Sequence, residues 1–298
     1  MYGRMHGSGI ELRRDEETFV SGSRLTLMAV HAHPDDEASS TGGVLALSAT
    51  EGIETIVVTC TDGALGDDLG GAKPNSEGHD VKRVVAVREA ELARSCQILG
   101  VDEHVMLGYA DSGMKGWPEN DAPGSFWSMD VAQAAKPLAE LMNRYRPQVV
   151  VTYDANGFYG HPDHIQAHRI TLFAAEATGI PAKIYFPTFP HSALAGFAEA
   201  LKEAGETLPE TGDAEGDATP LDDFGTPDEE VSAWLDCSAV VEKKRAALAA
   251  HASQLESTFF MKLSPERFAS MFGTEAYVRH LDTTGSATPE SDLFAGLR

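Results

Sequence analysis

Two clusters of histidine and carboxylate side chains interrupt the apolar pattern of this chain. The first is His31-Ala32-His33-Pro34-Asp35-Asp36-Glu37, and the second is His161-Pro162-Asp163-His164. In the first cluster, two imidazoles and three carboxylates within seven residues must repel and desolvate one another unless a cation or a proton relay lies among them. The composition of the clusters therefore predicts a metal site.

Imidazole and carboxylate ligands are typical of hydrolytic zinc sites, in which three protein ligands leave one position for water. One set of three would be His33, Asp36 and His164. The groups that remain for acid–base and orienting roles are then Asp35, His161 and Asp163. A carboxylate beside such a water can accept its proton, because the cation lowers the pKa of the water to roughly 7 in favourable cases. Zn²⁺ is the expected ion, although Fe²⁺ or another divalent ion would accept the same ligands.

Stretches that predict buried strands precede both clusters: residues 25–30 lead directly into the first, and residues 147–153 lead into the second through residues 154–160. A helical pattern follows each cluster, and strand and helix patterns alternate along the rest of the chain. This alternation predicts an α/β fold with a mostly parallel, Rossmann-like sheet and helices on both faces. At the carboxyl edge of such a sheet, residues far apart in sequence can converge. The two clusters are therefore expected to meet in one crevice.

The remaining patterns divide the chain into further elements. Strands are expected at residues 53–59, 103–109 and 183–189. Helices are expected at residues 41–51, 80–99, 130–145, 165–178 and 239–255. Residues 1–23 predict a flexible N-terminal tail, and residues 24–298 predict a single domain with short apolar islands near its C-terminus. Residues 203–230 hold eleven acids and no Lys or Arg, which is typical of an exposed insertion or a partly ordered lid.

Composition excludes several classes of function. The formal net charge of −23 argues against a nucleic acid or an anionic membrane as partner, since both require a basic face. No uninterrupted apolar stretch approaches the roughly 20 residues of a membrane span, and the N-terminus lacks the apolar core of a signal peptide. The three cysteines are widely spaced, which favours a reducing cytoplasm over a disulfide framework.

The two clusters together resemble the LmbE/PIG-L family of metal-dependent deacetylases, which remove acetyl from N-acetylglucosaminyl groups. The resemblance extends over most of residues 25–255. Three further stretches carry it: Arg88-Glu89-Ala90-Glu91-Leu92, Asp111-Ser112-Gly113-Met114 and Ala250-His251-Ala252-Ser253-Gln254. It implies an LmbE-like domain, a Zn²⁺ cofactor and a small N-acetylated sugar as substrate.

The resemblance also implies a role for each matching residue. The implied zinc ligands are His33, Asp36 and His164, with Asp35 as the general base. Tyr159 and His161 would stabilise the tetrahedral oxyanion or assist the leaving group, and Asp163 would orient His161. Contacts to substrate hydroxyls are implied for Arg88 and Asp111.

Within the family, the chain is most similar to the mycothiol-pathway enzymes: the deacetylase acting on N-acetylglucosaminyl-inositol and the amidase acting on mycothiol S-conjugates. Two positions depart from the biosynthetic deacetylase. Ala110 stands where that enzyme has an arginine, and Phe158 stands where it has a glycine. The substrate thus stays open between an N-acetyl sugar and a larger thiol-sugar conjugate.

Alternatives of another class also stay open. The chain could be a non-catalytic domain that binds metal or a nucleotide-sugar, although no G-x-G-x-x-G stretch opens the first helix. Phe158 and Tyr159 could be a packed aromatic pair, and His251 could be a core or surface residue of its helix. Structural roles are expected for His31, His104, His168 and His191.

Overall fold

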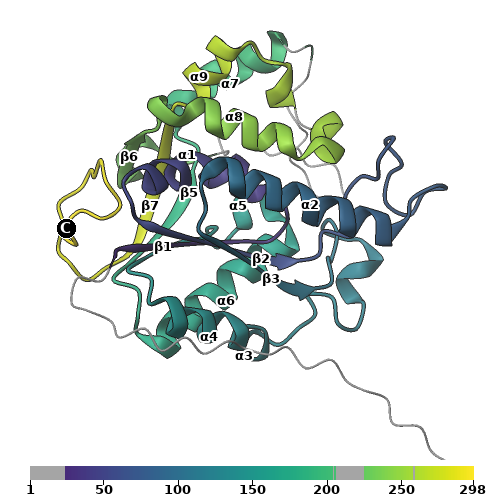
Figure 1. Ribbon diagram of the computed structural model, residues 1–298, viewed down its shortest axis with the longest axis horizontal. Coiled ribbons are helices and arrows are strands. Elements are labelled where there is room, and N and C mark those ends of the chain that lie inside the picture. The colour runs from purple at the N-terminus through teal and green to yellow at the C-terminus, as the bar shows by residue number, and fades with distance from the viewer. Residues whose placement is uncertain (1–23, 204, 206–224, 258) are drawn as a thin grey trace, which may run out of the picture.

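A seven-stranded sheet runs through the centre of the molecule, with helices on both faces (Figure 1). The computed structural model describes residues 24–203, 205, 225–257 and 259–298. In spatial order the strands are β3 (Glu103–Tyr109), β2 (Glu54–Thr61), β1 (Thr26–His31), β4 (Val149–Val151), β5 (Lys183–Thr188), β7 (Thr274–Asp282) and β6 (Ala233–Asp236). The first five are parallel and the last two pair antiparallel, so the predicted mostly parallel α/β fold is confirmed.

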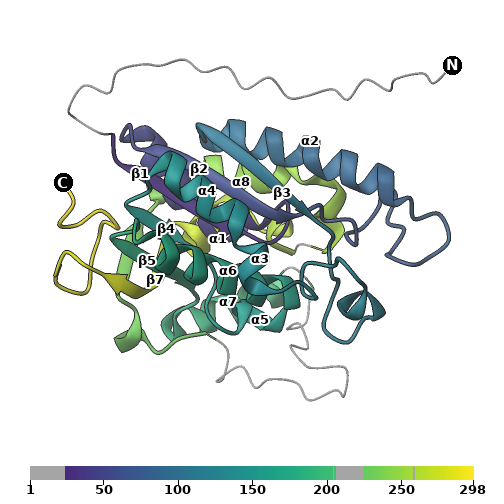
Figure 2. The same cartoon turned by 90° about the horizontal axis from the view of Figure 1, so that it is seen from below.

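The two faces of the sheet are buried under different helices (Figure 1 and Figure 2). Alternate residues of β1 enter different cores, since Leu27 and Ala29 face one cluster while Met28 and Val30 face the other. The hydrophobic core that contains Leu27 and Ala29 lies under α1 (Asp36–Thr50), α2 (Val81–Leu99), α8 (Val241–Ala250) and α9 (Pro265–Phe272). The hydrophobic core that contains Met28 and Val30 lies under α3 (Val131–Ala134), α4 (Lys136–Tyr145) and α6 (Pro162–Thr178). Two further helices are α5 (Gly157–Gly160), which directly precedes the second polar cluster, and α7 (His191–Glu203), which directly precedes the acidic segment in sequence.

Both helices that follow the polar clusters begin earlier than the sequence pattern predicts. Helix α1 begins at Asp36 instead of residue 41, and α6 begins at Pro162 instead of residue 165. At α6 the reason is Pro162, because proline is favoured in the first turn of a helix, where its missing N–H has no intrahelical acceptor. As a result, Asp36 and His164 belong to the first turns of α1 and α6.

Two predicted helices are interrupted or shortened. The helix expected at residues 130–145 is divided into α3 and α4 next to Pro137, which cannot donate an intrahelical hydrogen bond. The helix expected at residues 239–255 ends at Ala250, and η5 (Ala252–Ser257) follows. The backbone of His251 departs from helical geometry, with ψ of 54°, and the His251 side chain bonds to Glu37.

Strands β6 and β7 were not predicted, and in β7 the buried Glu275 and other charged residues break the apolar pattern. Glu275 of β7 forms a 2.6 Å ion pair with the buried Lys244 of α8, and its carboxylate also accepts hydrogen bonds from Gly43 N and Val44 N of α1. Long-range pairing therefore keeps a charged side chain inside the structure.

Two parts of the predicted organisation fall largely outside the described residues: the tail at 1–23 and most of the acidic insertion at 203–230. Among the helices that are described, none combines the length and apolar composition needed to cross a membrane.

The close approach at Gly43 gives a test of this packing. A Cβ there would lie 2.6 Å from Glu275 Oε1 and 2.8 Å from Cys237 Sγ. We expect Gly43→Ala to lower the free energy of unfolding by about 1–3 kcal/mol, as overpacked cores do. Gly196→Ala in α7 is the matched control, since no described atom lies within 4 Å of its added Cβ. The control should be stabilising by about 0.5–1 kcal/mol. Urea denaturation measures both, and equal stabilities of the two variants would contradict the packing.

Candidate metal centre

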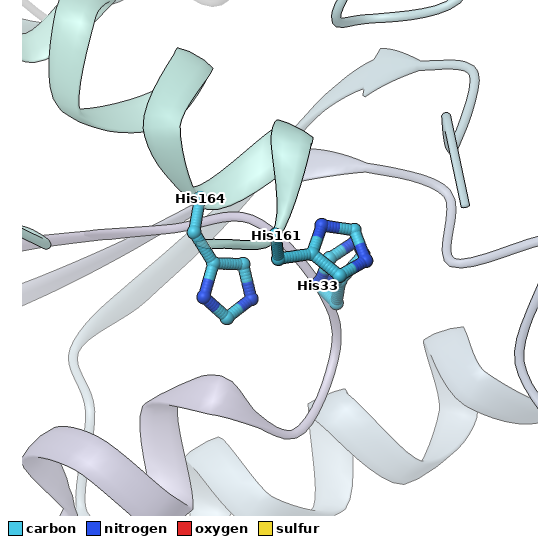
Figure 3. A group of neighbouring side chains, drawn as sticks. All are labelled: His33, His161 and His164. Carbon is cyan, nitrogen blue, oxygen red and sulfur yellow. The ribbon is translucent and has the colours of Figure 1, made fainter. Parts of the chain in front are cut away.

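The two polar clusters meet at the carboxyl edge of the sheet. Strands β1 and β4 pair in parallel, so the residues that follow them emerge side by side. The rings of His33, His161 and His164 gather there, with centroids separated by 4.6 Å (His33–His161), 4.9 Å (His161–His164) and 5.3 Å (His33–His164) (Figure 3). All three side chains are buried.

His33 is held so that one ring nitrogen is available. Its Nε2 lies 3.3 Å from Asp163 Oδ2, and that oxygen also accepts a 2.9 Å hydrogen bond from Ser112 N. Its Nδ1 lies 3.4 Å from Asp36 Oδ2. A carboxylate that accepts the proton of one imidazole nitrogen fixes the ring and leaves the other nitrogen for a metal. The ring is thus oriented with Nδ1 toward Asp36.

Burial would lower the pKa of His33, but the carboxylates of Asp111, Asp163 and Asp36 outweigh it and raise that pKa well above its ordinary value. The surrounding negative charge therefore favours a cation at this position. A divalent ion on Nδ1 would supply the same positive charge in place of the proton.

His164 presents an unused lone pair. Its Nδ1 lies 3.2 Å from the carbonyl oxygen of Gly157, which can only accept, so Nδ1 carries the proton and Nε2 does not. Burial lowers the pKa of His164 to about 4, which keeps the ring neutral. Its Nε2 is buried, lies 3.6 Å from Asp36 Oδ2 and has no hydrogen-bond donor among the described residues. Such an orphaned lone pair fits a metal ligand.

Asp36 supplies the negative charge of the set. Its Oδ2 accepts a 2.8 Å bond from His33 N and a 2.7 Å bond from the hydroxyl of Tyr153, which itself accepts a bond from Ala32 N. Burial would raise the pKa of Asp36, but the imidazoles of His164 and His33 outweigh it and hold the pKa well below its usual range. The donor set of His33, Asp36 and His164 is thus suited to a divalent ion.

Two groups of described residues bring three potential ligand atoms within 4.8 Å of one another, and neither of them contains Asp36. One is His33, His161 and His164, and the other is His33, Asp111 and Asp163. In the first, Nδ1 of His161 already accepts a hydrogen bond from Asp163 N. In the second, the His33 nitrogen that faces the carboxylates is the one bonded to Asp163. The second group therefore uses a nitrogen that is already bonded, and in the first group only Nε2 of His161 is left for an ion.

His161 is oriented by a backbone amide, which corrects the expectation that the Asp163 side chain orients it. The side chain of His161 caps α6, because its Nδ1 accepts a 3.1 Å hydrogen bond from Asp163 N. The carboxylate of Asp163 bonds to His33 and Ser112 instead. Burial, with the neighbouring His33 and His164, lowers the pKa of His161. The neutral ring carries its proton on Nε2, where it can donate.

Asp35 lies at the entrance of the site in an unusual backbone conformation, with φ of 123° and ψ of −27°. Its Oδ2 accepts a 3.0 Å hydrogen bond from Arg88, and 32% of its side chain is exposed. Burial raises the pKa of Asp35 to about 6, against the opposing effect of Arg88. A carboxylate that is both accessible and weakly basic near neutral pH has the properties of a general base.

Arg88 and Asp111 hold the loops around the crevice. The buried guanidinium of Arg88 donates to the carbonyl oxygens of Gly63 and Pro34, as well as to Asp35. The carboxylate of Asp111 lies 3.8 Å from His33 Nε2 and accepts bonds from the backbone amides of residues 65 and 113. Direct contact of either side chain with a substrate stays a prediction.

The turn that carries Tyr159 borders the same site. The Tyr159 ring lies edge-on to His164, at a centroid distance of 5.0 Å, and 45% of the residue is exposed. Its ring also meets Phe158 edge to face at 6.4 Å, so both the site position and the aromatic pairing are present. Phe158 has φ of 67° and ψ of −55°, a backbone region that favours glycine.

Three residues of the centre received no role from the sequence: Tyr153, Glu37 and Ser112. Glu37 is fully buried and bonds to His251 at 2.7 Å, so of the two expectations for His251 the core position is confirmed and the surface position is wrong. The position of Glu37 in the first polar cluster was the local signal for this pair, since the predicted helix began only at residue 41. His31 and His168, for which structural roles were expected, bond to the hydroxyl of Thr41 and to the carbonyl oxygen of Tyr153.

Comparison with known proteins places these motifs among related sequences. The sequence pattern of the family described as GlcNAc-PI de-N-acetylase (PIG-L) matches residues 28–175. The chain is 42% identical over 284 residues to the 1D-myo-inositol 2-acetamido-2-deoxy-alpha-D-glucopyranoside deacetylase of Acidothermus cellulolyticus, covering 91% of this chain and 95% of that relative.

Solved structures share the fold at low sequence identity. The N,N'-diacetylchitobiose deacetylase of Pyrococcus horikoshii is 19% identical with a TM-score of 0.55, covering 90% of this chain and 88% of the other. GalB, the 4-carboxy-2-hydroxymuconate hydratase of Pseudomonas putida, is also 19% identical with a TM-score of 0.55, covering 88% and 98%. These likenesses concern the fold alone.

The hydroxyl of Tyr153 gives a test of the ligand set. Tyr153→Phe removes the donor to Asp36 and leaves Ala32 N without its acceptor, so we expect metal affinity to fall by about 10–100-fold. Competition with a chromophoric chelator measures this affinity. Tyr185→Phe on β5 is the matched control, because its buried hydroxyl bonds to Glu290 and to no residue of the centre. Equal metal affinities of the two variants would contradict the role of Tyr153.

Proposed function

The chain belongs to the PIG-L family of GlcNAc-PI de-N-acetylases, and from that premise we propose that it is a zinc-dependent N-deacetylase. The proposed substrate is a small molecule with an N-acetylglucosaminyl group. The relatives are named as deacetylases of N-acetylglucosaminyl-inositol, so we propose a substrate of that type. The observation that carries the proposal is the orphaned Nε2 of His164, which faces Asp36 beside the accessible carboxylate of Asp35. A buried lone pair next to a general base fits metal-assisted hydrolysis.

His33, Asp36 and His164 would hold the metal. A bound divalent ion supplies Lewis acidity toward the acetyl carbonyl and lowers the pKa of water. The protein residues supply the proton transfers and the orientation. Asp35 accepts a proton from the attacking water, and Nε2–H of His161 donates a hydrogen bond to the oxygen that becomes negative as the carbonyl carbon turns tetrahedral. Tyr159 would donate to the same oxygen from the rim.

Collapse of the tetrahedral species breaks the C–N bond. The amine nitrogen needs a proton as it leaves, and the proton taken from water by Asp35 is available for that transfer. The products are acetate and the free amine of the sugar, so one water is consumed and no oxidant or reductant is required. This balance corresponds to hydrolysis of a linear amide bond.

A second candidate is an amidase that acts on a larger thiol-sugar conjugate. The feature that favours it is the exposed aromatic rim, since Phe158 is 38% exposed and Tyr159 45% exposed beside the site. Such a rim could contact an apolar group that N-acetylglucosaminyl-inositol lacks. A binding domain without catalysis is less well supported, because a purely structural metal site has no use for Asp35.

Two substitutions separate metal binding from chemistry. Asp35→Asn should keep one metal per chain and lower kcat by about 10²–10⁴-fold, because it removes the general base and retains the ligands. His164→Ala should lose both the metal and turnover. Metal content by atomic emission and amine release measure the two effects. Near-full activity in a metal-free His164→Ala protein would overturn the ligand set.

Substrate choice is tested by primary-amine release from a panel of N-acetylglucosamine, N-acetylglucosaminyl-inositol, diacetylchitobiose and a mycothiol S-conjugate. Metal-stripped protein is assayed with and without Zn²⁺. We expect zinc-dependent release with the highest kcat/KM for N-acetylglucosaminyl-inositol. Preference for the conjugate would select the amidase, and no release from any compound by zinc-loaded protein would contradict both.

A further inference from the structure

We propose that Glu37 is a positioning residue for the reaction, which holds the backbone of Asp35 from inside the protein. Its buried carboxylate accepts the hydrogen bond of Asp35 N and is held in turn by His251 and Ser95. This inference rests on the proposed function, in which Asp35 accepts a proton from water. It assigns a role in catalysis to the contact between Glu37 and His251, two residues that are 214 positions apart in sequence.

The backbone of Asp35 needs such support. Residues other than glycine rarely adopt a φ of 123°, and a conformation of this kind persists only where its surroundings maintain it. The side chain of Asp35 is fixed on one side by Arg88 at 3.0 Å. The amide of Asp35 is fixed on the other side by Glu37 Oε2 at 2.9 Å. The direction of the Asp35 carboxylate thus depends on both contacts.

Glu37 can serve as an anchor because its own position is determined by two other helical segments. The residue is fully buried, and its Oε1 accepts a 2.7 Å bond from His251, just after α8, and a short bond from the Ser95 hydroxyl on α2. A buried carboxylate is tolerated when hydrogen bonds and a cationic partner satisfy it. Both oxygens of Glu37 are therefore engaged, one toward the protein interior and one toward Asp35.

The segment after α8 is itself fixed to the rest of the crevice. Ser253 bonds through its amide and hydroxyl to Glu91 of α2, and Gln254 bonds through its side chain to the backbone of Asp67. These contacts place His251 opposite Glu37. The C-terminal part of the chain thus determines where Asp35 points.

A second buried carboxylate, Glu275, also joins α1 to α8, so this connection does not depend on Glu37 alone. Glu275 pairs with Lys244 of α8 at 2.6 Å and accepts bonds from Gly43 N and Val44 N of α1. That carboxylate also is buried and also binds backbone amides of α1, but those amides lie inside a regular helix. The amide bound by Glu37 belongs to the proposed base. Glu275→Gln is therefore the matched control for Glu37→Gln.

The test compares these two variants with the unchanged protein. Glutamine keeps the shape of the side chain but offers one oxygen, so it cannot accept from both Asp35 and His251. We expect Glu37→Gln to lower kcat by about 10–100-fold with KM and metal stoichiometry retained. Amide exchange of Asp35 in the metal-free protein, followed by NMR, should become at least about tenfold faster as protection is lost. Glu275→Gln should lower the melting temperature and leave kcat and Asp35 exchange unchanged.

The outcomes separate this inference from the proposed function. Unchanged exchange at Asp35, unchanged kcat, or loss of metal together with activity in Glu37→Gln would each overturn the positioning role. If Glu37→Gln does not fold, Ser95→Ala replaces it. We then expect faster exchange of the Asp35 amide and a smaller loss of kcat than in Glu37→Gln. No change in either quantity would overturn the inference. Absence of amine release from the unchanged protein would refute the proposed function, while Asp35 exchange still decides whether Glu37 holds that amide.

Discussion

The buried negative charge of Asp36 is the constraint to which the rest of the centre responds. The carboxylate is ionised inside the protein, where a charge without partners is strongly unfavourable. Its Oδ2 is met by a backbone amide and a tyrosine hydroxyl, and two imidazole nitrogens face it at 3.4 and 3.6 Å. Each of those imidazoles has its other nitrogen bonded, to Asp163 or to the Gly157 carbonyl. The protein therefore fixes which nitrogens point at Asp36 before any ion binds, and a proton on His33 or a bound cation balances the charge.

The sequence was sufficient to predict the α/β fold and the convergence of the two clusters, because both follow from local patterns. A strand pattern that ends in His and Asp residues predicts a site at the carboxyl edge of a parallel sheet. The contacts inside the site were less accessible. The side chain of Asp163 bonds to His33 and not to His161, because His161 caps α6 and its Nδ1 is used by a backbone amide. Strand β7 and the pairing of Glu37 with His251 depend on contacts between distant segments, and no local pattern specifies those.

The fold and the reaction carry separate information in this molecule. A deacetylase and a hydratase resemble the chain to the same degree in structure, at a TM-score of 0.55. The sheet with its helices therefore supports more than one chemistry, as widely used folds do. What favours amide hydrolysis is the chemistry of particular atoms: an orphaned imidazole lone pair, a carboxylate at the entrance, and a neutral imidazole whose remaining proton lies on Nε2.

Both clusters use the start of a helix, and this shared geometry explains their similar composition. Side chains in a first turn lean toward the helix N-terminus, so Asp36 of α1 and His164 of α6 point back into the crevice from which their helices emerge. The N-terminal end of α1 also carries partial positive charge, which favours the Asp36 carboxylate there. The two starts differ in one respect. The cap of α6 is a side chain, whereas Asp35 at the cap of α1 makes no side-chain capping bond and is held through its amide by Glu37. The Asp35 carboxylate is thereby released from a capping role and remains available at the entrance of the site.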